Sequence, residues 1–366
     1  MNKSAVLVFF VLFASYALVT SYSRQTSHPA MPPVLELTAV PSPPEPVQIG
    51  DLFDFSRCGY KQGLEPIPFV LAVITVRPGD GDDTDLIQQA IDTVSARAPD
   101  ANGFRGAVLL AEGEFQVNRH LKISANGVVL RGSGNEETRI LADGIDRRTL
   151  IRVEGAKPEE GASYTVASAA LRAGDTQIEL NNAMGLSVGD TVFIDRPASM
   201  PWIESLGMNN DTRGFSSKMI NWQEGSRVVR WDRTITDVSG NVITLDNPVT
   251  TEMSAAMQTQ PTVTAYTWQG RLELVGIENV CFVSNPDVET NPKDEEHAWI
   301  CIQFWNVKDS WIRNVTAKKF VSSAVWFDHT VSQCTVEHSR FLDPVSEIGG
   351  RRRISFRNGG QLNLFE

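Results

Sequence analysis

The sequence predicts an all-β protein built as a right-handed parallel β-helix, with an N-terminal capping helix and an inserted antiparallel β subdomain. The main observation is a repeat: the pattern of residues 277–279 recurs at 312–314 and 336–338, at intervals of 35 and 24 residues. A second pattern at 300–304 recurs 23 residues later at 323–327. More than one short strand per period is typical of a solenoid whose coils stack at the ~4.8 Å strand spacing.

The first 50 residues are expected to lie outside this fold. Lys3 precedes the apolar residues 5–20, and small polar residues follow, which predicts a secretory signal peptide over 1–22. We therefore expect a secreted or periplasmic protein with no stable membrane insertion after cleavage; an uncleaved N-terminal anchor is the alternative. Seven prolines between Pro29 and Pro46 predict a semi-rigid linker over 23–50.

Residues 51–160 are expected to form the N-terminal cap and the first coils. Asp82 and Asp83 precede apolar residues at helical spacing as far as Val94, which predicts a helix over 83–97. Short β-prone runs divided by glycines follow. The helix is expected to cover the open apolar end of the solenoid, where strand edges would otherwise be unpaired.

Two further regions complete the predicted organisation. Residues 161–255 contain alternating strands around a turn at 239–241, which predicts an inserted antiparallel β subdomain. Residues 256–366 carry the remaining coils, and the 35-residue interval predicts a loop over 284–297. The final residues, 361–366, have the pattern of a strand within a coil, so we expect the set of coils to be incomplete at the C-terminus.

Stacked coils place equivalent residues in columns. Ile302 and Val325 are therefore expected inside the solenoid, while Gln303 and Trp326 are expected to face outward. The last residues of the three repeats (Asn, Asn and His) predict a ladder of turns. The middle residues of the repeats (Glu, Arg and Glu) alternate in charge, as cross-strand ion pairs would.

Composition restricts the possible partners. The chain has 33 basic and 44 acidic residues, a net charge of −11, which argues against nucleic acid and anionic lipid as partners. The four cysteines lack the C-x-x-C spacing of zinc or redox sites. Cys58 could pair with one of the other three after export, and the spacing does not say which. The oligomeric state stays open.

Several motifs carry a resemblance to a known family. Residues 80–84, 87–92, 106–110 and 128–132 resemble the N-terminal signature of the pectate lyase superfamily, although its usual form has one or two further residues between Gly81 and Asp82. From residue 51 onward the chain is similar to secreted bacterial proteins described only as pectate-lyase-like. The resemblance implies a β-helix and is weak for the reaction, since one fold hosts many activities.

An arginine cluster is the first candidate for chemistry. Arg351, Arg352, Arg353 and Arg357 lie within seven residues of an otherwise acidic chain. Guanidinium groups pair with carboxylates, and lyases of the resembled superfamily use an arginine or lysine to abstract the proton next to a uronate carboxyl. We therefore predict catalytic roles for Arg351, Arg352 and Arg353 and substrate binding by Arg357. A solvated loop is the structural alternative.

The acidic loop 287–297 is the second candidate. Glu296 and His297 are predicted as further catalytic residues, while Asp294 and Glu295 offer hard oxygen ligands for Ca²⁺, the ion that bridges protein and acidic substrate in pectate lyases. The spacing matches no EF-hand. A solvated acidic face is the alternative for the whole loop.

Aromatic and polar residues suggest where a sugar chain would bind. Residues 325–329 resemble a short pectate lyase signature. In the columns of the stacked coils Val325 and Phe327 fall inside, which leaves Trp326 and Asp328 for the outer face. Together with Gln303 and Arg357 they form the predicted substrate-binding set. All eight tryptophans lie in the second half of the chain, where some are expected to stack on sugar rings and others to fill the junction with the subdomain.

These observations predict a polysaccharide lyase that cleaves a uronate-containing polysaccharide by β-elimination. The chain lacks the paired aspartates and downstream Gly-His-Gly of polygalacturonases. A glycoside hydrolase that uses another pair of carboxylates is one alternative. A non-catalytic glycan-binding or surface scaffold is the other.

Overall fold

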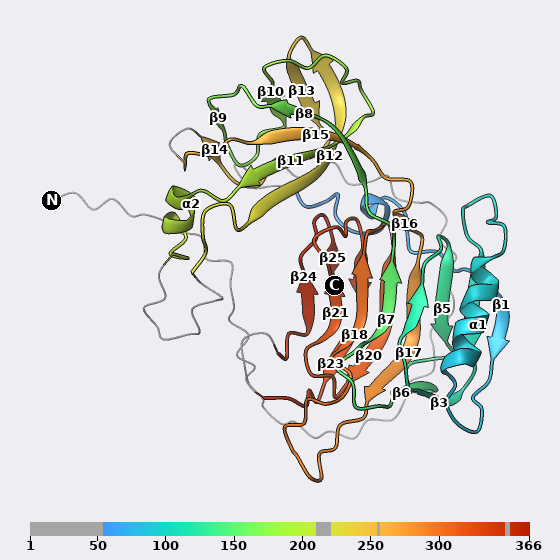
Figure 1. The fold of residues 1–366 in the computed structure, drawn as a ribbon. Helices are drawn as coiled ribbons and strands as arrows, with labels where there is room; N and C mark the ends of the chain where they lie inside the picture. The colour runs from blue at the N-terminus through green and yellow to red at the C-terminus, as the bar shows by residue number, and fades with distance from the viewer. Residues whose placement is uncertain (1–53, 210–220, 255–256, 348–351) are drawn as a thin grey trace, which may run out of the picture. The chain divides into compact units, whose positions relative to one another are not determined.

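The computed structural model describes residues 54–209, 221–254, 257–347 and 352–366. The predicted signal peptide and linker fall outside these residues. The described chain forms parallel strands that stack coil upon coil, together with an antiparallel sheet (Figure 1). The predicted fold class, a parallel β-helix with a capping helix and an inserted antiparallel sheet, is confirmed.

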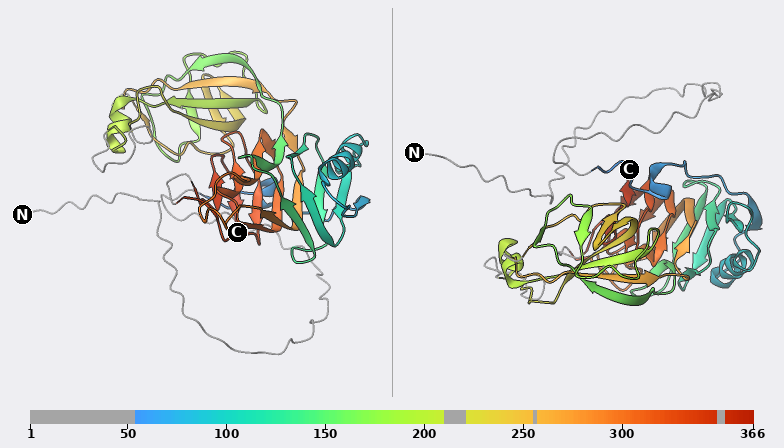
Figure 2. Two further views of the ribbon diagram at one scale, coloured as in Figure 1. Left: turned by 60° about the horizontal axis from the view of Figure 1, so that its bottom comes forward. Right: turned by 90° about the horizontal axis from the view of Figure 1, so that it is seen from above.

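Two parallel sheets make up the coils. The ten-stranded sheet contains β1 (Ala72–Val76), β2 (Gly106–Leu110), β3 (Gly113–Val117), β5 (Val128–Gly132), β6 (Thr138–Ala142), β17 (Gly276–Ser284), β20 (Trp311–Lys318), β22 (Thr335–Glu337), β23 (Arg340–Leu342) and β25 (Leu364–Phe365). The five-stranded sheet contains, in spatial order, β24 (Phe356–Asn358), β21 (Ser323–Phe327), β18 (Ile300–Trp305), β7 (Thr149–Glu154) and β4 (Leu121–Ile123). A short pair joins β16 (Leu272–Glu273) to β19 (Val307–Lys308). Figure 2 shows the strands of successive coils side by side.

The register of the strands matches the columns expected from the repeat. Ile277 pairs with Ile312 and then Val336, and Ile302 pairs with Val325. Ile302 and Val325 are buried in the core, as predicted, because alternate residues of each strand point inward. Stacked rings of Phe304 and Phe327, with centroids 5.1 Å apart, fill part of the interior.

A bend in each coil explains the column of Asn and His residues. Asn279, Asn314 and His338 have φ of 57°, 50° and 50°, a left-handed conformation that asparagine tolerates better than most residues. The Asn314 amide donates to Asn279 Oδ1 at 2.8 Å, so the bends are also linked from coil to coil. The predicted turn ladder is present.

The capping helix α1 (Thr84–Ser95) covers the first coil and contacts β1, β2 and β5; Figure 1 shows it beside β1 and β5. Ile87, Ile91 and Val94 lie on its buried face and join the core of the solenoid. Asp83 stabilises the preceding loop, since its Oδ1 accepts the backbone N–H of Gly79 at 2.8 Å. The apolar end of the solenoid is therefore shielded, as the helical spacing predicts.

An ion-pair ladder crosses the outer face of the ten-stranded sheet. Glu278 is fully buried between Arg131, 2.5 Å away, and Arg313, in the alternating column expected from the repeat. Residues 60–71, which begin with the short 3-10 helix η1 (Tyr60–Gly63), run over this ladder. Pro68 accepts a hydrogen bond from Arg313 at 3.3 Å, and the Phe69 ring lies 4.3 Å from the Arg131 guanidinium.

The inserted sheet lies in sequence between β7 and β16. Its spatial order is β10 (Gln177–Glu179), β13 (Val242–Leu245), β12 (Val228–Ser239), β11 (Thr191–Pro197), β15 (Thr262–Thr267) and β8 (Glu159–Thr165), all antiparallel. The same region contains a two-stranded antiparallel pair, β9 (Ala170–Leu171) with β14 (Met253–Ser254), and the short helix α2 (Met200–Ser205). A two-residue turn at Gly240, whose φ is 61°, joins β12 to β13. Val192, Ile194 and Trp231 belong to a separate core, so the sheet packs as its own layer.

The predicted loop 284–297 leaves the coil where β17 ends at Ser284, and the chain rejoins it where β18 begins at Ile300. Cys58, Cys281, Cys301 and Cys334 are free thiols, so no disulfide involving Cys58 is formed. No helix in the described ranges is both long and apolar enough to cross a bilayer.

Candidate functional site on the outer face of the five-stranded sheet

Four residues lie in one row on the outer face of the five-stranded sheet: three of them were predicted from the sequence to bind substrate, and the fourth is placed beside them by the strand pairing. Arg152, Gln303, Trp326 and Arg357 are direct partners on β7, β18, β21 and β24. Their neighbours one position earlier point into the core, so the side chains of this column point away from it. We call these four residues the first outer column.

Trp326 and Arg357 are in direct contact within this column. The Arg357 guanidinium lies 3.9 Å from the centroid of the Trp326 ring, a cation–π contact, and Arg357 is exposed while Trp326 is partly buried. An indole plane next to a cation matches a sugar ring that carries a carboxylate. The structure thus brings together two residues that the sequence places 31 positions apart.

Gln303 requires a correction. Its side chain leaves the core side of β18 as expected, but only 3% of the residue is exposed. Its Oε1 accepts a hydrogen bond from Thr149 Oγ1 at 2.9 Å. Neighbours in the stacked coils cover it, so Gln303 supports the surface and does not itself reach a ligand.

A second outer column lies two residues further along each strand. Glu154 pairs with Trp305, and Asp328 continues the same register after β21. Lys122 Nζ lies 3.1 Å from Glu154 Oε2, and the Arg152 guanidinium is 6.0 Å from the Trp305 ring. Carboxylates, cations and indoles therefore alternate over neighbouring coils.

His329 follows this column at the end of β21. Its Nδ1 lies 2.5 Å from Asp328 Oδ1, and its side chain is 74% exposed, whereas that of Asp328 is 19% exposed. A carboxylate that contacts Nδ1 orients the ring and leaves Nε2 free to exchange a proton. His329 belongs to the motif 325–329 but is not among the site residues predicted from the sequence. Its position after an outward Trp and an outward Asp was the available signal.

Arg152, Glu154 and Trp305 were also missed as site residues. Trp305 extends the outward alternation of Gln303 by two positions, which the sequence pattern could have indicated. Arg152 and Glu154 lie on β7, before the inserted sheet, so no local pattern connects them with β18. Only the parallel pairing of β7 with β18 places them here.

The arginine cluster is divided by the fold. Arg351 lies outside the described residues. Arg352 forms an ion pair with Glu295 that includes an Nη2–Oε2 contact of 2.9 Å. Arg353 donates from Nη2 to the Ser346 carbonyl at 2.7 Å. Arg352 is therefore paired with a carboxylate, whereas an arginine base is expected to have positive neighbours that lower its affinity for the proton.

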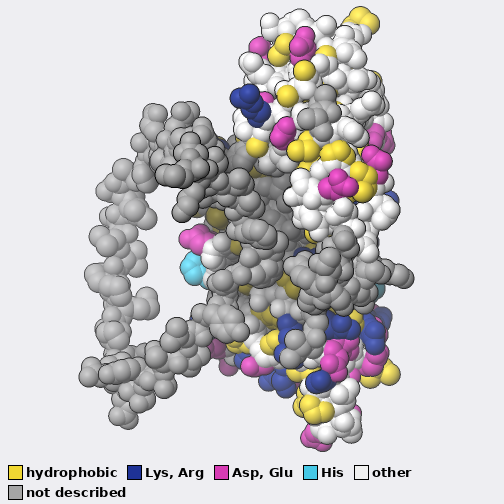
Figure 3. Space-filling model, turned by 90° about the vertical axis from the view of Figure 1, so that its left-hand side faces the viewer, with side chains coloured by type: hydrophobic (Ala, Val, Ile, Leu, Met, Phe, Trp, Pro, Cys, Tyr) yellow, Lys and Arg dark blue, Asp and Glu magenta, His cyan; other side chains and the backbone are white. Residues whose placement is uncertain are grey.

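The acidic loop contributes to the same paired cluster. Arg147 donates to Glu296 at 3.0 Å, and the guanidinium groups of Arg147 and Arg352 lie 5.4 and 5.7 Å from the Trp299 ring. Burial alone would raise the pKa of Glu295, but hydrogen bonds from Arg352 and from the Glu347 N–H lower it overall. Figure 3 shows basic and acidic side chains gathered at the lower end of that view. Because Arg147 pairs with Glu296 and Arg352 pairs with Glu295, the charges of these four side chains neutralise one another.

His297 is not placed for proton transfer to a substrate. The residue is fully buried, its Nδ1 contacts Ser284 Oγ at 2.7 Å, and its Nε2 lies 3.1 Å from the Asp294 carbonyl. Burial lowers the pKa of His297 even though the carbonyls of Val345 and Asp294 accept hydrogen bonds from it. The predicted catalytic role is replaced by one in holding the loop.

The residues expected to bind calcium do not fit that ion. Asp294 uses Oδ1 to accept the N–H of Glu296 and Oδ2 to accept that of Asp287, and Glu295 is paired with Arg352. A calcium site needs several free oxygens that converge on one point. Within the described ranges, no group of three or more His, Cys, Asp or Glu residues is arranged to hold a metal ion.

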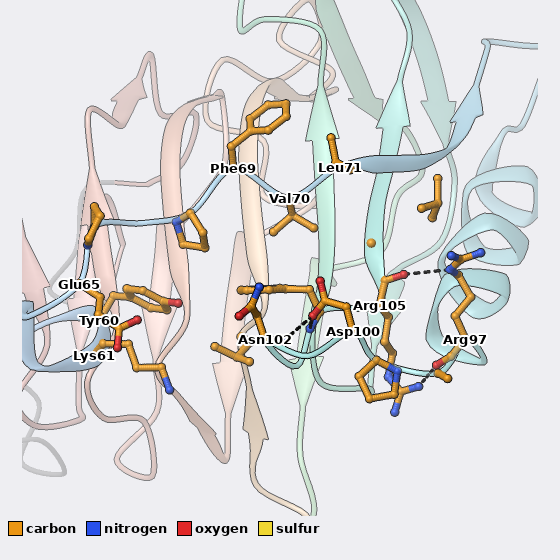
Figure 4. Close-up of a pocket in the computed structure, with 18 residues that line it drawn as sticks. Tyr60, Lys61, Glu65, Phe69, Val70, Leu71, Arg97, Asp100, Asn102 and Arg105 are labelled. Carbon is orange, nitrogen blue, oxygen red and sulfur yellow. Dashed lines mark hydrogen bonds between the residues drawn. The ribbon is translucent and has the colours of Figure 1, made fainter. Parts of the chain in front are cut away.

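A large pocket of about 690 Å³ lies elsewhere, between the segment 60–73 and the turn 97–106 (Figure 4). Its walls include Phe69 and Leu71, while Arg97 donates to the Arg105 carbonyl at 3.0 Å and is thereby held against the turn. No imidazole is present among the described residues that line it. It belongs to the ten-stranded sheet, and we place the candidate site on the five-stranded sheet.

Comparisons with known proteins give matches among solved structures. The chain matches no protein-family model and no curated protein sequence. Among solved structures it is similar to the tailspike protein gp49 from Pseudomonas phage LKA1 (16% identity, TM-score 0.41). It is also similar to the Gp54 tailspike of Acinetobacter baumannii bacteriophage AP22 in complex with capsular saccharide (7%, 0.32), and to the Streptococcus pneumoniae surface protein and adhesin PfbA (13%, 0.33). The matches cover 70%, 71% and 75% of this chain and 35%, 48% and 41% of those chains. The chain thus spans less than half of each.

Proposed function

We propose that this protein binds an acidic polysaccharide on the outer face of the five-stranded sheet and cleaves it by β-elimination. The observation that carries the proposal is that the Trp326–Arg357 contact on β21 and β24 is followed, directly after β21, by the Asp328–His329 pair. Together they supply a stacking surface, a partner for a carboxylate and a Brønsted base. The pectate lyase resemblance and the predicted signal peptide support an exported enzyme of this class.

The proposed chemistry assigns one role to each group. Arg357 pairs with the substrate carboxylate, which makes the proton on the adjacent carbon more acidic. His329 Nε2 removes that proton while Asp328 stabilises the resulting imidazolium. The released electron pair forms a carbon–carbon double bond, the glycosidic C–O bond breaks, and the leaving oxygen takes a proton from water. The hydroxide that remains takes the proton from His329, which restores both the base and the water.

The test is incubation of the full chain with a panel of uronate polymers, followed by the ultraviolet absorbance of unsaturated products. Replacement of His329 by Gln is expected to lower kcat at least about 100-fold, the usual contribution of a general base. Arg357→Ala is expected to raise KM more than it lowers kcat. His338→Asn is the control, because His338 is exposed and lies on the other sheet in a conformation that Asn adopts equally well. Activity of His329→Gln equal to that of the control would remove His329 from the mechanism.

A glycoside hydrolase is the second candidate, favoured by one feature. Glu154 and Asp328 lie two coils apart in the second outer column, so their backbones are separated by about twice the ~4.8 Å strand spacing, with Trp305 between them. Inverting hydrolases hold their two carboxyl groups ~6.5–9.5 Å apart. In that case new reducing ends form without unsaturated products, and Glu154→Gln abolishes cleavage. A lyase that uses His329 keeps most of its activity in Glu154→Gln.

Binding without cleavage is the remaining outcome. A sedimentation or calorimetric assay in which acidic glycan binds, while neither unsaturated products nor reducing ends accumulate, would identify a glycan-binding protein. Loss of that binding in Arg357→Ala would still place the site on the outer face.

A further inference from the structure

A second groove, of about 650 Å³, lies on the inserted sheet. It crosses β8, β15 and β11, where Glu160, Tyr266 and Thr191 are direct partners in one row. This face is opposite to the one that packs Val192 and Ile194 into the core of the inserted sheet. The groove is therefore built by regular strands and is distinct from the outer columns of the five-stranded sheet.

Trp268 forms one wall of this groove and is held in a fixed orientation. Its Nε1–H donates to the Ala156 carbonyl at 2.7 Å, and the Arg271 guanidinium lies 4.3 Å from the ring. The rings of Tyr266 and Phe193 meet it edge-on, at centroid distances of 5.8 and 6.1 Å. Arg271 lines a small neighbouring cavity and not this groove, so the indole separates the two spaces. An indole with one face covered and the other directed to a groove is a rigid stacking surface.

The polar lining of the groove is acidic. Glu159, Glu160 and Asp190 supply carboxylates, and Arg230 holds Glu160 Oε1 at 2.5 Å. Carboxylates accept hydrogen bonds from hydroxyl groups and repel uronates. The outer face of the five-stranded sheet differs in that Arg152 and Arg357 lie there among its carboxylates, so that face offers cationic partners for a uronate.

Space for a ring is left by glycine. Gly189 lines the groove, and no atom lies within 4 Å of the position that a Cβ would occupy there. Its φ of 94° also favours glycine at this position.

We propose that this groove is a second glycan-binding site, one that takes an uncharged pyranose stacked on Trp268 with its hydroxyl groups donating to Glu159, Glu160 and Asp190. The site goes beyond the proposed cleavage and does not depend on it. A chain that holds a uronate on one surface and a neutral sugar on another is suited to a polysaccharide that contains both.

The test uses the full chain titrated with neutral gluco-, galacto- and manno-oligosaccharides, with a uronate tetramer as the charged comparison. Binding is followed by calorimetry and by the NMR signal of the Trp268 indole N–H. Trp268→Ala is expected to weaken binding of the neutral oligosaccharide at least about tenfold, as loss of a central aromatic contact does. Trp268→Phe, which keeps an apolar ring, is expected to lose less and serves as the check on folding.

Matched controls separate this site from the cleavage site. Glu159→Gln is expected to weaken neutral-sugar binding, while Glu179→Gln, an exposed strand residue of the same sheet outside the groove, is expected to leave it unchanged. His329→Gln is expected to bind neutral sugars like the native chain even if cleavage is lost. The proposal is overturned if no neutral oligosaccharide binds the native chain, or if Trp268→Ala binds it equally well.

Discussion

At the scale of single residues, charge pairing decides which polar groups are available for chemistry. Glu295 and Arg352 are part of a predicted catalytic and metal-binding region, yet they bind each other, with side chains 11% and 22% exposed. Asp328 and His329 also form a pair, but the imidazole is left largely in solvent. The difference in exposure, rather than residue type, separates a structural pair from a candidate base.

Glu295→Gln is expected to lower the free energy of unfolding at pH 7 by about 1.5–3 kcal/mol, the usual range for a hydrogen bond to a charged partner. The pKa of Glu295 is lowered in the folded protein, so below about pH 4.3, its ordinary value, the unfolded chain binds this proton more readily than the folded one. Stability from the pair is present above that pH and is lost as pH falls through the folded pKa.

Urea unfolding of the native and Glu295→Gln proteins, at pH values from 7 down to 3, measures the stability that the Glu295–Arg352 pair contributes. The difference between native and Glu295→Gln proteins should shrink as the pH falls. Glu347→Gln is the control, because its pair with Lys293 is more than half exposed and is expected to be worth less than about 1 kcal/mol. Equal effects of the two substitutions would contradict the argument.

At the scale of elements, the outer face of the ten-stranded sheet depends on one buried carboxylate. Glu278 accepts from Arg131, Arg313 and the Trp311 indole N–H, the last at 3.1 Å. It therefore links β5, β17 and β20, and through Arg313 and Pro68 it also helps to hold the segment 60–71. Removal of its charge leaves two guanidinium groups without their shared partner.

Glu278→Gln is expected to destabilise the protein by about 3 kcal/mol or more, since breaking a buried ion pair leaves uncompensated charge. Thermal and urea unfolding give the free energy. Glu337→Gln is the matched control, because Glu337 lies in the same column, is partly exposed and forms no ion pair with another described residue; it is expected to change stability by less than about 1 kcal/mol. If the Glu278→Gln protein is as stable as the control, the free-energy cost of burying the Glu278 carboxylate equals the gain from its ion pairs with Arg131 and Arg313.

At the scale of the whole described chain, a few polar residues connect the solenoid with the inserted sheet. Gln361 Oε1 accepts from the Arg233 guanidinium at 2.7 Å, and its amide donates to the Arg230 carbonyl at 3.3 Å. Arg271, next to β16, pairs with Asp232 of β12 at 2.6 Å. Each of the two parts has its own apolar core, so these polar contacts carry much of the coupling.

The double substitution Gln361→Ala with Arg271→Ala is expected to reduce the cooperativity of unfolding. Because the two cores are separate, the inserted sheet should then melt in a transition of its own, resolved by calorimetry from that of the solenoid. Asn358→Ala is the control, an exposed residue of the last coil that makes no contact with the inserted sheet among its described hydrogen bonds. A single transition in the double variant, with the control unchanged, would show that other contacts couple the parts.

The repeat was sufficient to predict the solenoid, its columns and its bends. Ile277, Ile312 and Val336 recur because each coil must bury an equivalent side chain, and Asn279 and Asn314 recur because each coil must bend at the same point. Such constraints act within one period, so they leave a local pattern in the sequence. The helix over the first coil is predictable for the same reason, from apolar spacing alone.

Other properties were decided only by the tertiary structure. Arg152 and Glu154 lie in the outer columns because β7 pairs with β18, although the whole inserted sheet separates these two strands in the sequence. Arg352 lies against Glu295, 57 positions away in the sequence, and is paired with it. Gln303 faces outward as expected but is covered by neighbouring coils. Local patterns fix which way a side chain points, whereas distant contacts fix its exposure and its charged neighbours, and these determine what a residue can do.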